Sequence, residues 1–221
     1  MGIVAKPALR TAGWEKCGSF PALVRQSRMT DEDIVFKTIT DVDFADINLT
    51  NLSFSQVLFD HCRFDEACVA KASFREVVFE SCAFSNRKFT DGWFNHCEFR
   101  NSKGVGADFT GSQMMHVSMV GCNLTYADFS LVRFGNCSIV DCDMKDTVFH
   151  GCQLKAMELE RSSFVGADFF HTPLRNIDFS SCEFTSIHVS EEAVELRGAI
   201  VNVYQGADLA KLLGIVIKNE D

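Results

Sequence analysis

Residues 74–99 read FREVVFESCAFSNRKFTDGWFNHCEF, with phenylalanine at every fifth position. The same register extends in both directions, because every fifth residue from Phe44 to Val189 is apolar except Gly104. A helix repeats near 3.6 residues and a strand repeats every two, so neither element produces this spacing. A fixed period held over so many units predicts a repeat protein whose core is a column of stacked side chains.

A second inward position lies two residues before each centre and holds small or β-branched residues. Eight of the ten cysteines fall there, and buried cysteine behaves as a small hydrophobe. The chain has no CxxC motif and no Cys/His cluster with metal-ligand spacing, so we predict packing cysteines, no metal and no cofactor. Free thiols also fit a reducing compartment. The eight are Cys62, Cys82, Cys97, Cys122, Cys137, Cys142, Cys152 and Cys182.

Individual units carry a recognisable motif, seen in Ala107-Asp108-Phe109-Thr110-Gly111 and in Cys122-Asn123-Leu124-Thr125. In these units the chain resembles the pentapeptide-repeat family, whose motif is A(D/N)LXX. The resemblance implies an all-β solenoid, a right-handed quadrilateral β-helix with four pentapeptides per coil. At a strand spacing of ~4.8 Å per coil, the repeat should form a column of roughly 36 Å.

The two ends differ from the repeat. Residues 1–33 show no period of five and are interpreted as a cap, in which Trp14, Phe20, Leu23 and Val24 cover the open end; a basic tail with its own partner is the alternative. Residues 34–203 form the predicted β-helix. The spacing from Val189 to the next centre is seven, which indicates a two-residue insertion within residues 190–193.

Residues 204–221 are predicted to form a helix and a short strand. Leu209, Leu212 and Leu213 form a helical apolar stripe that Gly214 ends. Residues 215–217 then read as a strand.

Sorting the outward residues by twenty assigns them to four sides of the predicted column, numbered here in order around a coil. Side 1 is mildly basic, with Arg75, Arg133, Lys155 and Arg175 against Glu76, whereas the other three sides are acidic. The centres are Phe54, Phe74 and Phe94 on side 1; Phe59, Phe79 and Phe99 on side 2; Phe44, Phe64 and Phe84 on side 3; and Phe89 and Phe109 on side 4.

The net charge of −9 argues against binding to nucleic acid and permits an acidic body that competes for a basic groove. Ordinary solubilising charge is the alternative. The acids expected to face a partner are Asp60, Glu80, Glu98, Asp141, Glu158, Glu160 and Asp178 on side 2, and Asp108, Asp128 and Asp168 on side 4. The chain has no apolar run long enough to cross a membrane and no signal-peptide pattern, so we expect a soluble, cytoplasmic protein.

One region departs from the pattern. Gly104 replaces an inward aromatic residue, and Arg87 and Gly92 occupy inward positions before a centre. Two interpretations stay open: drift that Met114 and Met119 compensate, or a softened and bent coil that matters for binding.

The C-terminal tail resembles that of Qnr quinolone-resistance proteins, a branch of the same family, in residues 194–198, in Tyr204-Gln205 and in residues 212–215. The resemblance implies an end-to-end homodimer and binding to DNA gyrase or topoisomerase IV by mimicry of duplex DNA. Unlike plasmid-borne Qnr proteins, this chain has no loop insertion between Phe44 and Val189. The residues expected at the dimer interface are Tyr204, Leu209, Leu212, Leu213, Ile215 and Ile217.

No nucleotide-binding loop, Ser/His/Asp arrangement or metal signature occurs, and the six histidines all fall at outward positions. The sequence therefore predicts a non-enzymatic protein that protects a topoisomerase from quinolones or a toxin. The alternative is a pentapeptide-repeat scaffold that binds another protein.

Overall fold

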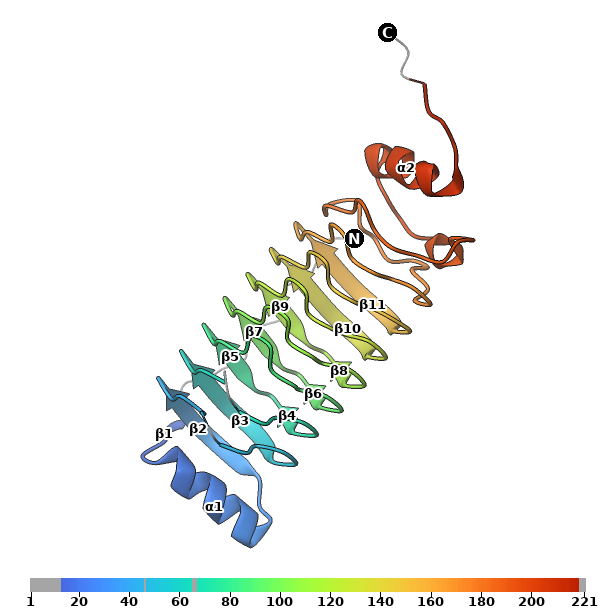
Figure 1. Ribbon diagram of the computed structural model, residues 1–221. Coiled ribbons are helices and arrows are strands. Elements are labelled where there is room, and N and C mark those ends of the chain that lie inside the picture. The colour runs from blue at the N-terminus through green and yellow to red at the C-terminus, as the bar shows by residue number, and fades with distance from the viewer. Residues whose placement is uncertain (1–12, 46, 65–66, 219–221) are drawn as a thin grey trace.

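The computed structural model describes residues 13–45, 47–64 and 67–218, and Figure 1 shows them as a column of stacked coils with a helix at each end. The column is a parallel β-solenoid of about seven turns, which confirms the predicted all-β solenoid. The N-terminal elements are β1 (Glu15–Lys16), α1 (Phe20–Thr30), β2 (Ile34–Thr40), β3 (Ser53–Asp60), β4 (Ser73–Arg75) and β5 (Val78–Glu80). The middle and C-terminal elements are β6 (Trp93–Asn95), β7 (Glu98–Arg100), β8 (Gln113–Met115), β9 (Ser118–Val120), β10 (Arg133–Val140), β11 (Gln153–Glu160), η1 (Val194–Leu196), α2 (Val203–Ala210) and η2 (Lys211–Leu213).

The strands pair in parallel with a register of twenty residues, as in Phe54↔Phe74 and Phe74↔Phe94. Strands β3 to β11 lie on sides 1 and 2 of the column. Sides 3 and 4 are joined by isolated bridges with the same offset, such as Lys88↔Asp108 and Asp108↔Asp128. The four-sided sorting of the sequence therefore matches the observed coils.

A left-handed backbone residue turns the chain at each corner. The second residue after a centre has positive φ in nearly every described unit, for example Asn51 at 62° and Lys71 at 58°. Such a residue closes the turn between one side and the next, at a conformational cost of roughly 1 kcal/mol when it is not glycine. The burial of the adjacent centre offsets that cost, because a buried Phe contributes about 2–3 kcal/mol.

The interior is a ladder of aromatic rings. Phe89, Phe109, Phe129 and Phe149 stack with ring centroids 5.1–5.3 Å apart and interplanar angles of 19° or less. Each of these four rings is at most 2% exposed. The core is therefore a continuous stack along the column axis.

Gly104 leaves neither a cavity nor a bend. A Cβ at this position would lie 2.1 Å from Cε2 of Phe84 and 2.9 Å from Cδ2 of Leu124, so neighbouring side chains already occupy the space. The backbone ladder is also intact, since Gly104 donates to the carbonyl of Asn123 at 2.8 Å. The softened-coil interpretation is wrong, and compensated drift is correct, although Phe84 and Leu124 fill the gap.

Helix α1 lies over the N-terminal end of the column, while residues 1–12 of the segment interpreted as a cap lie outside the described residues. Phe20 is 2% exposed, and its ring lies 4.6 Å from that of Phe44 in an edge-on contact. Val24 is buried beside it, and Leu23 is partly buried against the same core. Helix α1 thus shields the first ring of the ladder from water.

The C-terminal end follows the predicted two-residue insertion, because Asp178 bridges Ile200 at an offset of 22 instead of twenty. The Gln205 side-chain amide of α2 donates to the carbonyls of Phe179 (2.9 Å) and Cys182 (2.7 Å) and so closes this end. The predicted helix is present as α2 and η2, and Gly214 ends it with a φ of 71°. The predicted strand at 215–217 is wrong: this segment leaves the column (Figure 1) and has no neighbouring strand with which to pair.

A seam separates β11 from the coil that follows it. Among the described residues, no backbone hydrogen bond joins β11 to residues 173–180, although sides 3 and 4 of the same two coils stay bridged, as in Ser163↔Glu183 and Asp168↔His188. Pro173 explains part of this break, because proline has no N–H and disrupts a ladder. The β11 residues Leu154 and Met157 are consequently less buried than their β10 counterparts.

We predict that this seam exchanges amide hydrogens faster than the rest of the column. The amides of Ala156 and Leu159 have no carbonyl partner in the next coil, so their exchange should be at least about tenfold faster than that of the equivalent β10 amides, Asn136 and Ile139. Hydrogen–deuterium exchange read by NMR or by fragmentation mass spectrometry measures this. Equal protection in β10 and β11 would show that the seam closes in solution.

Candidate functional site

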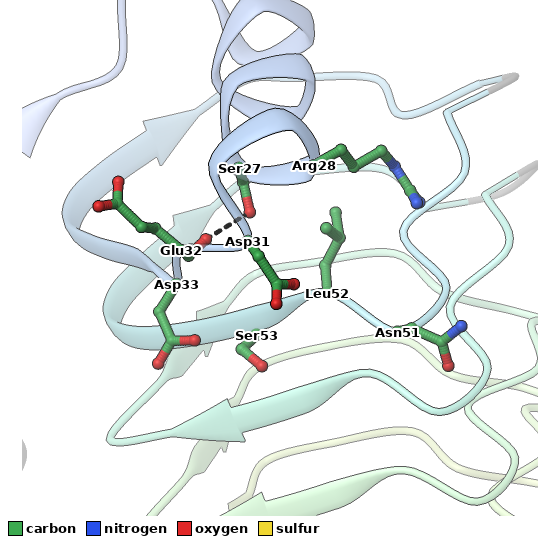
Figure 2. A pocket seen from close by; sticks show the side chains of 8 residues that line it. All are labelled: Ser27, Arg28, Asp31, Glu32, Asp33, Asn51, Leu52 and Ser53. Atoms are coloured by element: carbon green, nitrogen blue, oxygen red, sulfur yellow. Dashed lines mark hydrogen bonds between the residues drawn. The ribbon is translucent and has the colours of Figure 1, made fainter.

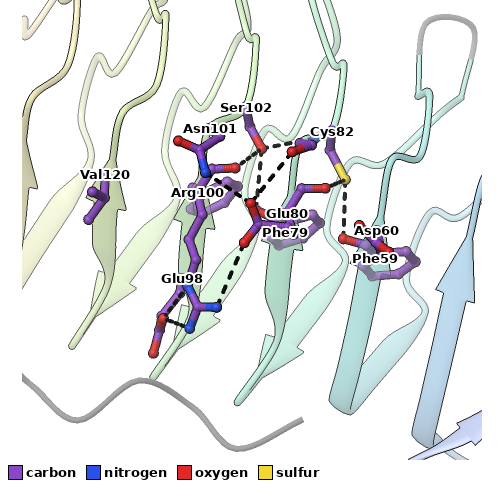
Figure 3. Close-up of polar contacts among 12 residues, drawn as sticks. Phe59, Asp60, Phe79, Glu80, Cys82, Glu98, Arg100, Asn101, Ser102 and Val120 are labelled. Carbon is purple, nitrogen blue, oxygen red and sulfur yellow. Dashed lines mark hydrogen bonds and ion pairs between the residues drawn. The ribbon is translucent and has the colours of Figure 1, made fainter.

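The first half of side 2 is an acidic surface cross-linked by one arginine. Figure 3 shows Arg100 between two carboxylates: it donates to Glu98 through Nε at 2.8 Å and lies 3.7 Å from Glu80. Glu80 also accepts from Asn101 at 3.0 Å, while Asp60 contacts its neighbour His61 at 2.7 Å. These acids lie where the sequence placed them, but Arg100 offsets part of their charge.

The second half of side 2 repeats this arrangement. Arg161 donates to Asp141 and to Glu160, each at 2.7 Å. The hydrogen bond from Arg161 lowers the pKa of Asp141, and the two carboxylates raise that of Arg161. Glu158 is exposed, and its side chain forms no hydrogen bond or ion pair with another described residue, so its charge is available to a partner.

An apolar interval separates the two halves. Val120, which is 38% exposed, and the partly buried Val140 occupy the register position that holds Asp60 and Glu80 in the first half and Glu160 in the second. Side 2 is therefore two acidic clusters and not one continuous column of charge. Val120 is visible next to the first cluster in Figure 3.

The predicted aspartates of side 4 have a structural task as well. Asp108, Asp128 and Asp168 each accept a hydrogen bond from the backbone N–H two residues later, at 2.8–2.9 Å. Asp178 on side 2 does the same with Ser180, which lowers the pKa of Asp178. This is an Asx turn, the reason that Asp and Asn suit the position before a centre. These carboxylates are therefore directed partly at the backbone and not wholly at a partner.

The cysteines pack as predicted. All eight in-register cysteines are buried, and Cys97 donates its thiol to the carbonyl of Phe74 at 3.3 Å. Burial raises the pKa of Cys97 to about 12, so the group stays a neutral thiol. A neutral buried thiol is neither a nucleophile nor a metal ligand.

Within the described ranges, no three His, Cys, Asp or Glu side chains are grouped so that they could hold a metal ion. No helix in that part of the chain is both long and apolar enough to cross a bilayer.

A pocket of about 200 Å³ lies where α1 meets the second coil, and Figure 2 shows its lining. Arg28 donates to the backbone carbonyls of Asn48 (2.9 Å) and Thr50 (3.3 Å), and Ser27 donates to the carbonyl of Glu32 at 2.6 Å. The polar groups of this pocket thus fasten the cap to the column.

The C-terminal tail exposes apolar side chains. Tyr204 is 86% exposed, Leu213 59%, Ile215 52%, Ile217 47% and Leu212 43%. The sixth residue predicted for the dimer interface, Leu209, is instead partly buried against the core of its own chain. Five of the six are therefore available to a partner, and Leu209 contributes to the cap.

Glu195 is a buried carboxylate that the sequence did not single out. It is 3% exposed and accepts hydrogen bonds from the backbone N–H of His171 (3.0 Å) and of Ser190 (3.2 Å) and from the Ser190 hydroxyl (2.7 Å). Burial alone would raise its pKa, but these hydrogen bonds outweigh burial and lower it. Glu195 therefore holds the inserted loop against the last coil.

We predict that Glu195→Gln destabilises the protein by about 1–3 kcal/mol at neutral pH. The Nε2 group of Gln is a hydrogen-bond donor, and it would face the donor groups of His171 and Ser190 without an acceptor. A lowered folded-state pKa gives stability that is present above the unfolded value of about 4.3 and is lost as pH falls through the folded value. The difference between wild type and variant should therefore shrink on acidification. Denaturant unfolding from neutral to acidic pH measures this. Glu191→Gln, at an exposed position in the same loop, is the control, and an equal effect there would contradict the assignment.

Sequence reasoning also missed Arg197 and Phe170. Arg197 lies on side 1 next to Arg175, since the N–H of Asn176 bonds to the carbonyl of Gly198. The two-residue insertion moves Arg197 out of the twenty-residue sorting, and a count corrected by two would have found it. Phe170 is an outward phenylalanine that is 37% exposed, a departure from a register in which nearly every other Phe is a centre.

The repeat matches a known family model, and solved pentapeptide repeat proteins align with the chain at low identity. The model of the pentapeptide repeat region matches residues 52–129 and 112–189. HetL, a pentapeptide repeat protein involved in heterocyst differentiation regulation from the cyanobacterium Nostoc sp. strain PCC 7120, aligns with 14% identity and a TM-score of 0.48, covering 80% of this chain and 90% of HetL. Full-length QnrB1, a plasmid-mediated fluoroquinolone resistance protein, aligns with 24% identity and a TM-score of 0.45, covering 83% of this chain and 91% of QnrB1. A thylakoid-lumen pentapeptide repeat protein from Arabidopsis thaliana aligns with 16% identity and a TM-score of 0.34, covering 79% of this chain and 90% of that protein. No curated protein sequence matches the chain.

Proposed function

This chain belongs to the pentapeptide-repeat family, and on that premise we propose that it binds DNA gyrase or topoisomerase IV as a DNA mimic. It would occupy the basic DNA-binding groove and protect the enzyme from quinolones or a topoisomerase-poisoning toxin. Solenoids of this family are typically scaffolds and not enzymes, so binding alone would carry the function.

The observation that carries the proposal is the charge of the column. Three contiguous sides are acidic, and the two arginines of side 2 are each held between carboxylates. A basic groove would therefore meet negative charge from three directions. Carboxylates in place of phosphates steer association and make the binding depend strongly on salt.

The charge density of the column indicates how strongly it should bind a basic groove in comparison with DNA. A net charge of −9 on a column of roughly 36 Å gives about one net charge per 4 Å, against one per ≈1.7 Å for duplex DNA. The protein should therefore compete with DNA less through charge than through the fit of a rigid rod. Among the described residues between Phe44 and Val189 the column has no projecting loop, so its sides and ends would make the contacts.

The exposed tail supports a homodimer as part of this proposal. A two-fold contact through Tyr204, Leu213 and Ile217 would bury apolar side chains and join two columns end to end. The joined rods would present about twice the length of acidic surface.

The test is gyrase supercoiling in the presence of a quinolone, with and without the protein. We expect protection by the wild type, loss of protection as salt rises, and a loss of at least about tenfold in potency for Glu158→Lys/Asp178→Lys. The matched control is Glu32→Lys/Asp33→Lys, which makes the same charge change in the exposed loop after α1. Neither protection nor inhibition by the wild type would leave the alternative, a scaffold for another protein.

A further inference from the structure

Side 1 carries a row of cations that have no acidic partner. Arg133, Lys155, Arg175 and Arg197 are all exposed, and none forms a hydrogen bond or ion pair with another described side chain. We call these four residues the cationic stripe. The other basic residues of the column include several with carboxylate partners, such as Arg100 and Arg161.

The stripe runs along the column axis over four successive coils. Gly135 pairs with Lys155 in the strand register, which places Arg133 two residues from that pair. The Cγ atom of Arg175 lies 3.1 Å from the position that a Cβ on Gly198 would take, so its stem crosses the coil that carries Arg197. At ~4.8 Å per coil, the stripe spans roughly 15 Å.

No exposed carboxylate interrupts this surface. The outward residues of side 1 in the four coils are arginine, lysine, glutamine, asparagine, proline, alanine and glycine (residues 133, 135, 136, 153, 155, 156, 173, 175, 176, 197 and 198). They also include Glu195, whose carboxylate is buried and accepts hydrogen bonds from His171 and Ser190. In a chain with a net charge of −9, a surface of four cations without exposed acids is a local reversal of sign. Such a reversal attracts anionic partners and repels the cationic groove proposed for the other sides.

An apolar ledge borders the stripe at the corner between sides 4 and 1. Leu131 is 63% exposed and Phe170 is 37% exposed, and the Phe170 ring contacts His171 with centroids 4.0 Å apart. The pocket at the end of the ledge is lined by Glu192 and Glu195 as well as by Pro173 and Val194, so it does not suit an acidic partner. The apolar contact surface is the ledge itself.

We propose that the cationic stripe and this ledge form a docking site for an extended acidic peptide that carries an apolar anchor residue. Carboxylates of the peptide would pair with the stripe, and the apolar anchor would lie on the ledge of Leu131 and Phe170. Aromatic and arginine side chains are among the residues that contribute most to binding at protein interfaces.

The width of the surface selects a peptide over duplex nucleic acid. Glu158 and Asp178 lie beyond one corner on side 2, and Asp168 lies beyond the other on side 4. A single extended chain fits between these acids, and about four or five of its residues span the stripe at ~3.3 Å each. A duplex would overlap the flanking carboxylates and be repelled.

The test uses fluorescence anisotropy with the full-length protein and a fluorescein-labelled peptide in which Asp and Glu flank a central Phe. At low salt the wild type should bind this peptide, and Lys155→Glu/Arg175→Glu should weaken binding by at least about tenfold. Replacing the Asp and Glu of the peptide with Asn and Gln should abolish binding, and Phe170→Ala should weaken it severalfold. Arg75→Glu, on side 1 but at the other end of the column, is the matched control and should bind like the wild type.

Several outcomes would overturn the proposal. These are no binding of the acidic peptide, equal weakening by Arg75→Glu, tighter binding of a single-stranded oligothymidine than of the peptide, or a stripe-dependent self-association in ultracentrifugation that accounts for all binding. Circular dichroism of each variant establishes that the column is intact. Peptide binding tests the docking site, and gyrase protection by the same variants tests the proposed topoisomerase function separately. Failure of one proposal can therefore be distinguished from failure of the other.

Discussion

Phe109→Ala is expected to lower the free energy of unfolding by about 3–5 kcal/mol, because the truncation removes a whole aromatic ring from the core. Phe109 is fully buried at the middle of the ladder, where its ring stacks between Phe89 (5.2 Å) and Phe129 (5.1 Å). The coils on both sides are tied by backbone hydrogen bonds, so they cannot move together to fill the space. The substitution would therefore leave a cavity in addition to the lost transfer free energy.

Denaturant unfolding followed by circular dichroism measures this effect. The control is Phe170→Ala, the same change at an exposed outward position of the same side, which should alter stability by less than about 1 kcal/mol. A loss below about 1 kcal/mol for Phe109→Ala would show that the column relaxes around a missing ring.

Leu213→Asp is expected to convert the proposed dimer into a monomer. Leu213 is 59% exposed on its own chain, so the substitution leaves the fold of the monomer unchanged. In the dimer the new carboxylate would lie in an apolar interface, where an unpaired charge is strongly unfavourable. Self-association should weaken at least about a hundredfold, which corresponds to roughly 3 kcal/mol.

Sedimentation equilibrium of wild type and variant decides between dimer and monomer. Leu131→Asp, at a similarly exposed leucine on the side of the column, should leave the association state unchanged. A monomeric wild type, or a Leu213→Asp variant that stays dimeric, would mean that the tail serves only as a cap. Leu209→Asp is not equivalent, because Leu209 packs against its own column and its loss should also lower the stability of the monomer.

Much of the fold followed from the sequence, because a period of five indicates a repeat architecture and the units resemble the pentapeptide-repeat motif, which implies a four-sided β-helix. Nearly all centres from Phe44 onward are buried, with Leu154 and Val189 partly buried. Eight cysteines fill the second inward position, and charge sorted by twenty falls on real sides of the column. The two-residue insertion could also be found in the sequence, because any added residue shifts the following centres out of the period of five.

The candidate surfaces were predictable only as lists of outward residues. The sequence does not show which charged side chains form ion pairs. It could not show that Arg100 and Arg161 pair with carboxylates, whereas Lys155 and Arg175 have no acidic partner among the described residues. Nor could it tell that the side chain of Asp108 caps a turn or that residues 215–217 lack a strand partner. These are properties of distances between coils.

The sequence by itself determined the repeat, its four sides and the overall sign of its charge, because the period places every residue inward or outward. Only the tertiary structure decided what each position does. At Gly104 the sequence shows a missing ring, but the ring of Phe84 already lies in that space. At Pro173 the sequence shows an ordinary outward residue, but the missing N–H coincides with a seam through the ladder. Side-chain packing and hydrogen bonding join residues about twenty positions apart, and no local sequence pattern shows whether two such side chains are in contact.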